Sequence, residues 1–194
     1  MQHQLQAYAR GLALPLDDLL HANTLLREDI QRLMDAFNDD WDDQTFRRIL
    51  VRACWSHIEA VVFGLKQMVL MACTLGSEDL SAKTQAFLRE SEISVDGRGN
   101  ATVRVVRTDT LKNVKLSLKL ASKYFDVPWK PNFRAPAWGQ LAESLELRHR
   151  LTHPKSAAAL FVSDSETEAL RDGFLWFSGG FNDFLQSMQQ RHVV

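Results

Sequence analysis

The feature that most constrains the fold is a long helical pattern from about Thr45 to about Thr74, which contains no proline. Its apolar residues recur at spacings of three and four, as on one face of an α-helix. A shorter helix is expected to follow and to end at about Glu92. Four further stretches share the helical spacing: Leu16 to about Phe37, Thr110 to Phe125, Ala137 to about Leu151, and about Ser165 to Gln190. These patterns predict an all-α helical bundle.

Residues 93–107 depart from the helical pattern. A glycine-rich turn separates two arms that contain β-branched residues, and Val103 and Val105 alternate with polar residues. This pattern predicts a small β-hairpin inserted into the helical chain. Residues 126–136 hold three of the five prolines and are expected to form a loop. Because no repeat or linker divides the chain, residues 1–194 are predicted to form a single helical domain.

Charge and apolar content argue against several classes of protein. The formal net charge is -1, so any contact with nucleic acid must come from a local patch. The longest apolar runs are too short to span a bilayer, and the N-terminus lacks the pattern of a signal peptide. Cys54 and Cys73 fall in one long helix and are not expected to pair, and lone thiols suit a reducing compartment. We predict a cytoplasmic protein without a membrane segment.

The sequence offers no pattern for a metal or a cofactor. Cysteine and histidine spacing does not match a zinc site, and no strand leads into a glycine-rich phosphate loop. The acidic tract of residues 38–43 lacks the glycine and the distal glutamate of a calcium loop. Its carboxylates are expected to cap the helix that begins near Thr45. We therefore expect neither a cofactor nor a metal.

The segment from Glu146 to Pro154 contains the side chains best suited to binding a substrate and transferring protons. A guanidinium such as that of Arg148 can grip a phosphate with two parallel hydrogen bonds. A histidine such as His153 titrates near neutral pH and can move a proton during catalysis. Together the two groups would suffice to cut RNA without a metal ion.

Spacing alone does not identify these residues as a site, because Arg52 and His57 show the same spacing. A five-residue step on an ideal helix turns by about 500°, which leaves the two side chains roughly 140° apart. Arg52 and His57 lie mid-helix and are interpreted as structural. Pro154 breaks the helix beside His153, which can turn that histidine back toward Arg148. In the alternative interpretation, the cations of residues 148–153 only complete a helix C-terminus.

The surroundings of this segment resemble the HEPN superfamily (higher eukaryotes and prokaryotes nucleotide-binding). A long helix carries Trp55-Ser-His-Ile-Glu59, a later helix ends in Leu147-Arg-His-Arg-Leu-Thr-His-Pro154, and the likeness spans roughly Phe46 to Met188. Members are helical bundles with an Arg-x(4–6)-His motif. Many are metal-independent ribonucleases of toxin–antitoxin, abortive-infection or CRISPR systems, and they pair so that two motifs form one cleft.

The resemblance implies a metal-independent endoribonuclease that acts on RNA as a homodimer, with an antitoxin or a defence-system protein as partner. Arg148 and His153 match the catalytic motif, and Glu59 resembles the acidic residue that orients the motif arginine. Many members have asparagine where this chain has His149. Some toxins carry a tyrosine where Pro154-Lys155-Ser156 stands here, so regulation through that tyrosine is not implied. The alternative function is a non-catalytic helical module that binds a protein or a nucleotide.

Further charged residues have two interpretations each. Glu146 either pairs with Arg148 or is a solvated surface charge, whereas Glu59 is expected to be buried beside Arg148. Five cations are interpreted either as RNA contacts or as solvated surface charges: Arg150, Lys155, Lys112, Lys115 and Lys119.

Overall fold

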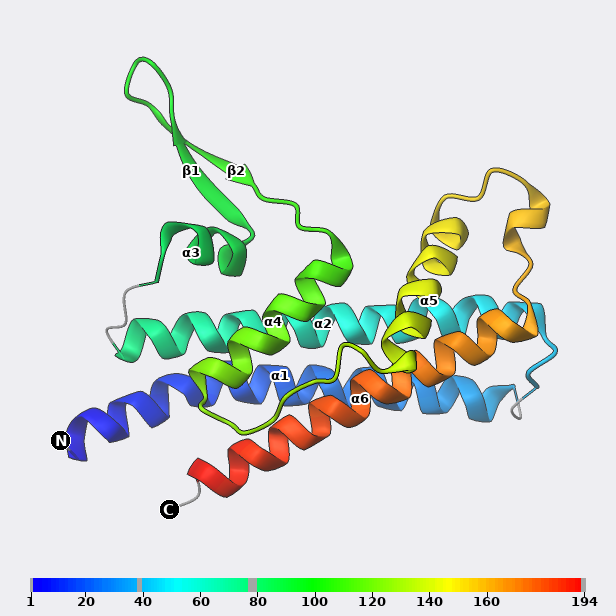
Figure 1. The fold of residues 1–194 in the computed structure, drawn as a ribbon, viewed down its shortest axis with the longest axis horizontal. Helices are drawn as coiled ribbons and strands as arrows, with labels where there is room; N and C mark the ends of the chain where they lie inside the picture. Colours follow the sequence, from blue (N-terminus) through cyan, green and yellow to red (C-terminus); the bar gives the residue numbers. More distant parts are fainter. Residues whose placement is uncertain (1, 38–39, 77–79, 193–194) are drawn as a thin grey trace. The chain divides into compact units, whose positions relative to one another are not determined.

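The computed structural model describes residues 2–37, 40–76 and 80–192. It confirms an all-α helical bundle with a small inserted hairpin (Figure 1). In chain order the elements are α1 (Gln2–Ala36), α2 (Gln44–Gly76), α3 (Ala82–Arg89), β1 (Ser91–Val95), β2 (Ala101–Val105), α4 (Thr110–Tyr124), α5 (Pro136–Thr152), the short 3-10 helix η1 (Ala157–Leu160) and α6 (Asp164–His192).

The chain separates into two compact units. Unit 1 takes in residues 1–20 and 62–127, and unit 2 takes in residues 21–61 and 128–194. Helices α1 and α2 therefore contribute to both units, whereas α3, the hairpin and α4 belong to unit 1, and α5 and α6 to unit 2. The expected single domain over residues 1–194 stays a prediction.

Local capping explains where several helices begin. The Asp43 carboxylate accepts hydrogen bonds from the backbone N–H groups of Thr45 and Phe46, at 2.6 and 2.8 Å. Asp109 accepts one from the N–H of Lys112 at 3.1 Å. A carboxylate in this position satisfies N–H groups that lack partners in the first turn of a helix. Capping by the acidic tract is thus confirmed, although Asp39 lies outside the described residues, and Asp109 caps α4 in the same way.

Two helix boundaries differ from those predicted. Helix α1 begins well before Leu16 and continues through Pro15, although proline removes a backbone donor and usually ends a helix. Helix α3 ends at Arg89 rather than near Glu92, because Glu90 adopts a left-handed conformation with a φ of 53°. Strand β1 starts directly after it, so the hairpin lies two residues earlier than predicted.

The hairpin of unit 1 is antiparallel, with Ile93 opposite Val103 and Val95 opposite Ala101. Figure 1 shows β1 and β2 extending away from α3 and α4. The Asp96 carboxylate closes the turn by accepting from the N–H groups of Arg98 and Asn100, at 2.8 and 2.9 Å. These hydrogen bonds also hold the pKa of Asp96 below its usual value, with the Asn100 side chain as the largest cause.

A buried ion pair also lies in unit 1. The Lys66 side chain on α2 is only 1% exposed, and its Nζ lies 2.8 Å from Oε1 of Glu90. The same ammonium sits 4.2 Å from the ring centroid of Phe87, where the ring face attracts a cation. A lysine is almost never fully buried unless it is paired. Glu90 therefore allows Lys66 to remain in the core as a cation.

Close packing of α5 and α6 forms the core of unit 2. A Cβ at Gly173 would lie 2.7 Å from the backbone of Leu141, so only glycine permits this approach. The indole Nε1 of Trp55 on α2 donates to the carbonyl and hydroxyl oxygens of Ser144 on α5, at 3.1 and 3.2 Å. The aromatic side chains of α6 are buried at Phe177, Phe181 and Phe184, which places them in the core.

Replacing Gly173 with alanine is expected to destabilise the protein by about 1–3 kcal/mol, because the new methyl group meets α5 backbone that cannot move aside cheaply. Gly179 lies on the same helix, and a Cβ there would meet nothing within 4 Å. Gly179→Ala is therefore expected to stabilise by up to about 1 kcal/mol, since alanine is the better helix former. Urea unfolding of both variants measures the contrast. Equal effects would refute the proposed close approach.

The proline-rich loop is anchored by its aromatic residues. Trp129 packs edge-on against Phe184 at 5.6 Å between ring centroids and also covers Gly180. Phe133 packs edge-on against Trp138 and Trp176, at 5.0 and 5.9 Å. These ring contacts hold the loop against α5 and α6.

Helix α2 is the one described helix that is long and apolar enough, by length and composition alone, to cross a membrane. The sequence prediction that no stretch reaches this length is therefore corrected. Half of its most apolar window is nevertheless buried inside the protein. The helix also buries Arg47, His57 and Lys66 against protein partners. This pattern fits a core helix, and the cytoplasmic location stays a prediction.

Candidate functional site

The end of α5 brings Arg148 together with Glu59 of α2. Nη2 of Arg148 lies 2.9 Å from Oε1 of Glu59, and the two side chains are 29% and 44% exposed. The expectation that Glu59 is buried is wrong, because this face of α2 is open to solvent. An exposed pair of this kind contributes little to stability, about 0–1 kcal/mol. Its main effect is to hold the guanidinium in one orientation at the surface.

His153 lies directly after α5 and is exposed. Its N–H still donates to the carbonyl of His149 at 3.1 Å, but its ψ of 63° ends the helix before Pro154. The expected stop at this proline is confirmed. Within the described part of the chain, no hydrogen bond joins Arg148 to His153. The two groups therefore share one solvent-exposed helix end without a hydrogen bond between them.

Arg150 anchors the loop that carries His153. Its guanidinium donates to the carbonyls of Ala159 and Phe161, at 3.1 and 2.8 Å, and it pairs with Glu166 at 2.5 Å. Glu166 in turn accepts from the N–H of Ser163 at 2.9 Å, in a capping box that starts α6. Figure 1 shows this loop joining the end of α5 to the start of α6. These contacts hold the Arg150 side chain against the loop. Contact of Arg150 with RNA stays a prediction.

Arginines of α2 also hold this loop and the last turn of α5. Nη1 of Arg48 lies 3.5 Å from the Leu160 carbonyl, and Nη2 of Arg52 donates to the Leu151 carbonyl at 3.1 Å. The buried Arg47 donates to the Val162 carbonyl at 2.8 Å. Each interaction joins residues about a hundred positions apart in the chain, so no local sequence pattern signals it. The loop after α5 is thus fixed on both sides by guanidinium groups.

The second Arg-x4-His pair of the chain divides into two different environments. Arg52 is exposed, whereas His57 is fully buried with its ring edge-on to Phe174 at 5.3 Å. Nε2 of His57 lies 2.9 Å from Oδ1 of Asn23, and Nδ1 has no partner among the described residues. The structural interpretation of His57 is confirmed. Arg52 reaches the end of α5, which sequence reasoning missed.

Acid is expected to destabilise the protein through His57. Burial, together with the nearby Arg27 charge, lowers the pKa of His57 from 6.5 to about 4. Between pH 6.5 and about pH 4, His57 binds a proton in the unfolded chain but not in the native state. Stability therefore falls as the pH falls through this window. The loss between pH 7 and pH 5 is about 2 kcal/mol.

Urea unfolding at pH 7 and pH 5 measures this loss, and His57→Gln is the comparison. This variant is expected to be less stable at pH 7 but to lose less stability on acidification. Equal losses in the two proteins would contradict a role for His57.

The other site residues predicted from sequence lie apart from the Arg148 ion pair. Glu146 and His149 are exposed, and Glu146 is two positions from Arg148, a spacing that does not bring helical side chains together. The surface interpretation of Glu146 is therefore favoured. Lys155 is exposed in the anchored loop. Three lysines lie on α4 in unit 1, and their contact with RNA stays a prediction: Lys112, Lys115 and Lys119.

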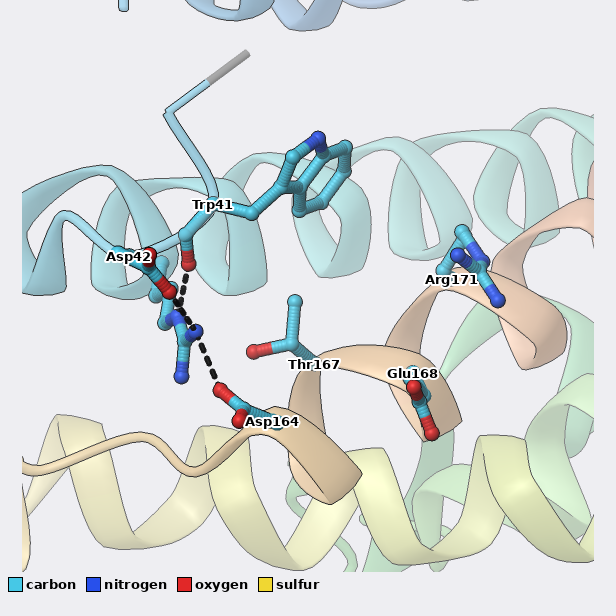
Figure 2. Close-up of a pocket in the computed structure, with 7 residues that line it drawn as sticks. Trp41, Asp42, Asp164, Thr167, Glu168 and Arg171 are labelled. Carbon is cyan, nitrogen blue, oxygen red and sulfur yellow. Dashed lines mark hydrogen bonds and ion pairs between the residues drawn. The ribbon is translucent and has the colours of Figure 1, made fainter.

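A separate pocket of about 250 Å³ lies between the start of α2 and α6. Figure 2 shows Asp42 and Asp164 converging on one side of it, with Glu168 and Arg171 along α6. The two aspartates pair with the buried Arg47 at 3.4 and 2.5 Å. Because its lining has three carboxylates against two guanidinium groups, both of which already pair with aspartates, this pocket does not suit a phosphate. The ion pair between Arg47 and Asp164 in this pocket links the start of α2 to the start of α6.

No family model, characterised protein or solved structure significantly matches the chain. The likeness to the HEPN superfamily therefore rests on the motif residues and the helices that carry them. Among the described residues, no group of three or more histidine, cysteine, aspartate or glutamate side chains is placed to hold a metal ion.

Proposed function

We propose that this protein is a HEPN-type endoribonuclease that works without a metal ion. The observation that carries the proposal is the Arg148–Glu59 ion pair, 2.9 Å long, at the exposed end of α5 where His153 follows. An oriented guanidinium and a solvent-exposed imidazole at one helix end are the two groups that this chemistry requires.

In this proposal Arg148 binds the scissile phosphate and neutralises its developing charge. Glu59 keeps the guanidinium in place. The 2′-hydroxyl loses its proton to His153, and its oxygen forms a bond to phosphorus. The bond from phosphorus to the 5′-oxygen breaks, and that oxygen takes up a proton. The products are a 2′,3′-cyclic phosphate and a 5′-hydroxyl, and no oxidant, reductant or metal enters the balance.

The proposal includes a homodimer, in which the His153 of the second copy can supply the proton to the leaving oxygen. It also includes a cellular setting of toxin–antitoxin or phage defence, with an antitoxin or defence protein as partner. Both parts derive from the resemblance to the superfamily. Cross-linking and light scattering of the purified protein test the dimer independently of its activity.

The test of the function is to incubate purified protein with single-stranded RNA in excess chelator. The wild type is expected to cleave the RNA, and the Arg148→Ala and His153→Ala variants are expected to lose most of that activity. Arg171→Gln removes a cation that pairs with Asp172 elsewhere on unit 2 and serves as the control. Cleavage that survives both site substitutions would exclude this mechanism.

The second candidate function is a non-catalytic module that binds a protein partner or a nucleotide. It is favoured by the lack of a hydrogen bond between Arg148 and His153 in the described residues. Wild-type protein that binds RNA in the same assay without cutting it would support this candidate.

A further inference from the structure

We infer that Arg52 is a phosphate-binding residue of the proposed RNA site and supplies the positive charge that Arg148 alone does not. The inference rests on the proposed function and deepens it. It starts from the face of α2 that passes beside the end of α5. Arg52, Ser56 and Glu59 follow each other there at steps of four and three, and all three are exposed.

The position of Arg52 is fixed by its contact with α5. Its Nη2 donates to the carbonyl of Leu151 at 3.1 Å. Leu151 lies in the last turn of α5, two residues before His153. Glu59, two turns further along α2, holds Arg148. Both guanidinium groups therefore lie beside the last turns of α5. Arg52 is the nearer of the two to the C-terminal end of that helix.

The charges of these arginines differ in how far they are compensated. Arg148 is paired with Glu59, and Arg150 is paired with Glu166. Among the described residues, no carboxylate lies within ion-pair distance of Arg52. Glu59 is seven residues away on the same helix, about 10 Å along its axis. Arg52 thus contributes a net positive charge at the site, whereas each of the other two is largely neutralised.

The guanidinium of Arg52 also keeps donors free for a ligand. An arginine has five N–H donors, and the Leu151 carbonyl takes one of them. Because the side chain is exposed, a phosphate can approach without displacing protein groups. With Arg148 at the scissile phosphate, Arg52 fits a neighbouring phosphate of the same strand, on the His153 side. Its role is to bind and position the RNA, and not to transfer protons.

The test measures the affinity of the full chain for a single-stranded 2′-O-methyl RNA, which cannot be cut through its 2′-oxygen, over a range of salt concentrations. Each phosphate contact adds roughly 0.7 to the slope of log affinity against log salt on single strands. Arg52→Gln is expected to lower this slope by about 0.7, and Arg52→Lys is expected to keep it because the charge remains. Arg171→Gln, the matched control, is expected to match the wild type.

A slope for Arg52→Gln equal to those of the wild type and Arg171→Gln would overturn the inference and leave the proposed nuclease intact. A lower slope for Arg52→Gln, together with a wild type that does not cleave unmodified RNA, would support Arg52 as a phosphate ligand and reject the nuclease. No salt-dependent binding by the wild type would reject both. Thermal melting of each variant by circular dichroism shows whether the loss of the Leu151 contact has unfolded the protein, and Arg52→Lys separates charge from packing.

Discussion

In the His153→Ala protein, the rate of RNA cleavage is expected to fall roughly 100- to 10,000-fold, the range for the loss of a group that transfers a proton. His153 is exposed at the end of α5, and within the described residues its side chain has no hydrogen-bond partner. Its removal should therefore leave stability nearly unchanged. A large loss of activity without a loss of stability is the signature of a chemical role.

Arg148→Ala is expected to lose roughly 100- to 1,000-fold in rate, as when one donor to a developing negative charge is removed. Glu59→Gln is expected to lose less, because the amide oxygen still accepts a hydrogen bond from the Arg148 guanidinium. Single-turnover cleavage rates of the three variants measure this order. If Glu59→Gln lost more activity than His153→Ala, Glu59 would be the proton-transfer group and the assignment would be wrong.

Replacing Glu90 with glutamine is expected to destabilise the protein by about 1.5–3 kcal/mol, the range for a hydrogen bond to a charged group, because only the Lys66 side of this ion pair is buried. The reason is the Lys66 ammonium, which is 1% exposed and would keep the face of Phe87 and a neutral amide oxygen but would lose its counter-charge. Glutamine has nearly the shape of glutamate, so the left-handed backbone at residue 90 is not further strained.

The control for this prediction is Lys66→Met, which leaves the half-exposed Glu90 hydrated. It is expected to be neutral or stabilising, as replacement of a buried ion by an apolar residue often is. Adding Glu90→Gln to Lys66→Met should then cost less than about 1 kcal/mol. Urea unfolding of the single and double variants completes the cycle. Additive effects would show that the two residues do not interact.

The fold could be predicted from the sequence where local chemistry decides the structure. Asp43 and Asp109 cap helices, and Pro154 ends α5, because each acts on backbone groups a few residues away. Pro15 shows the limit of such rules, since α1 continues through it.

The site could be predicted only in part. The motif predicts Arg148 and His153, and the family resemblance predicts Glu59. The sequence does not point to Arg52, because its spacing to His57 places the two on different faces of α2. Its contact with Leu151 depends on the pairing of α2 with α5, which are distant in sequence. The burial of Lys66 could not be predicted for the same reason, because Glu90 reaches it only after the chain turns at the end of α3.

The most direct test of the central claim is the chemistry of the RNA ends. Purified protein is incubated in chelator with an RNA of defined sequence, and the fragments are weighed by mass spectrometry. The mechanism through Arg148 and His153 requires a 2′,3′-cyclic phosphate on one fragment and a 5′-hydroxyl on the other. It also requires that a single 2′-deoxy substitution at the cleaved position stop the reaction. Fragments with a 3′-hydroxyl and a 5′-phosphate, or cleavage of the 2′-deoxy RNA, would contradict it.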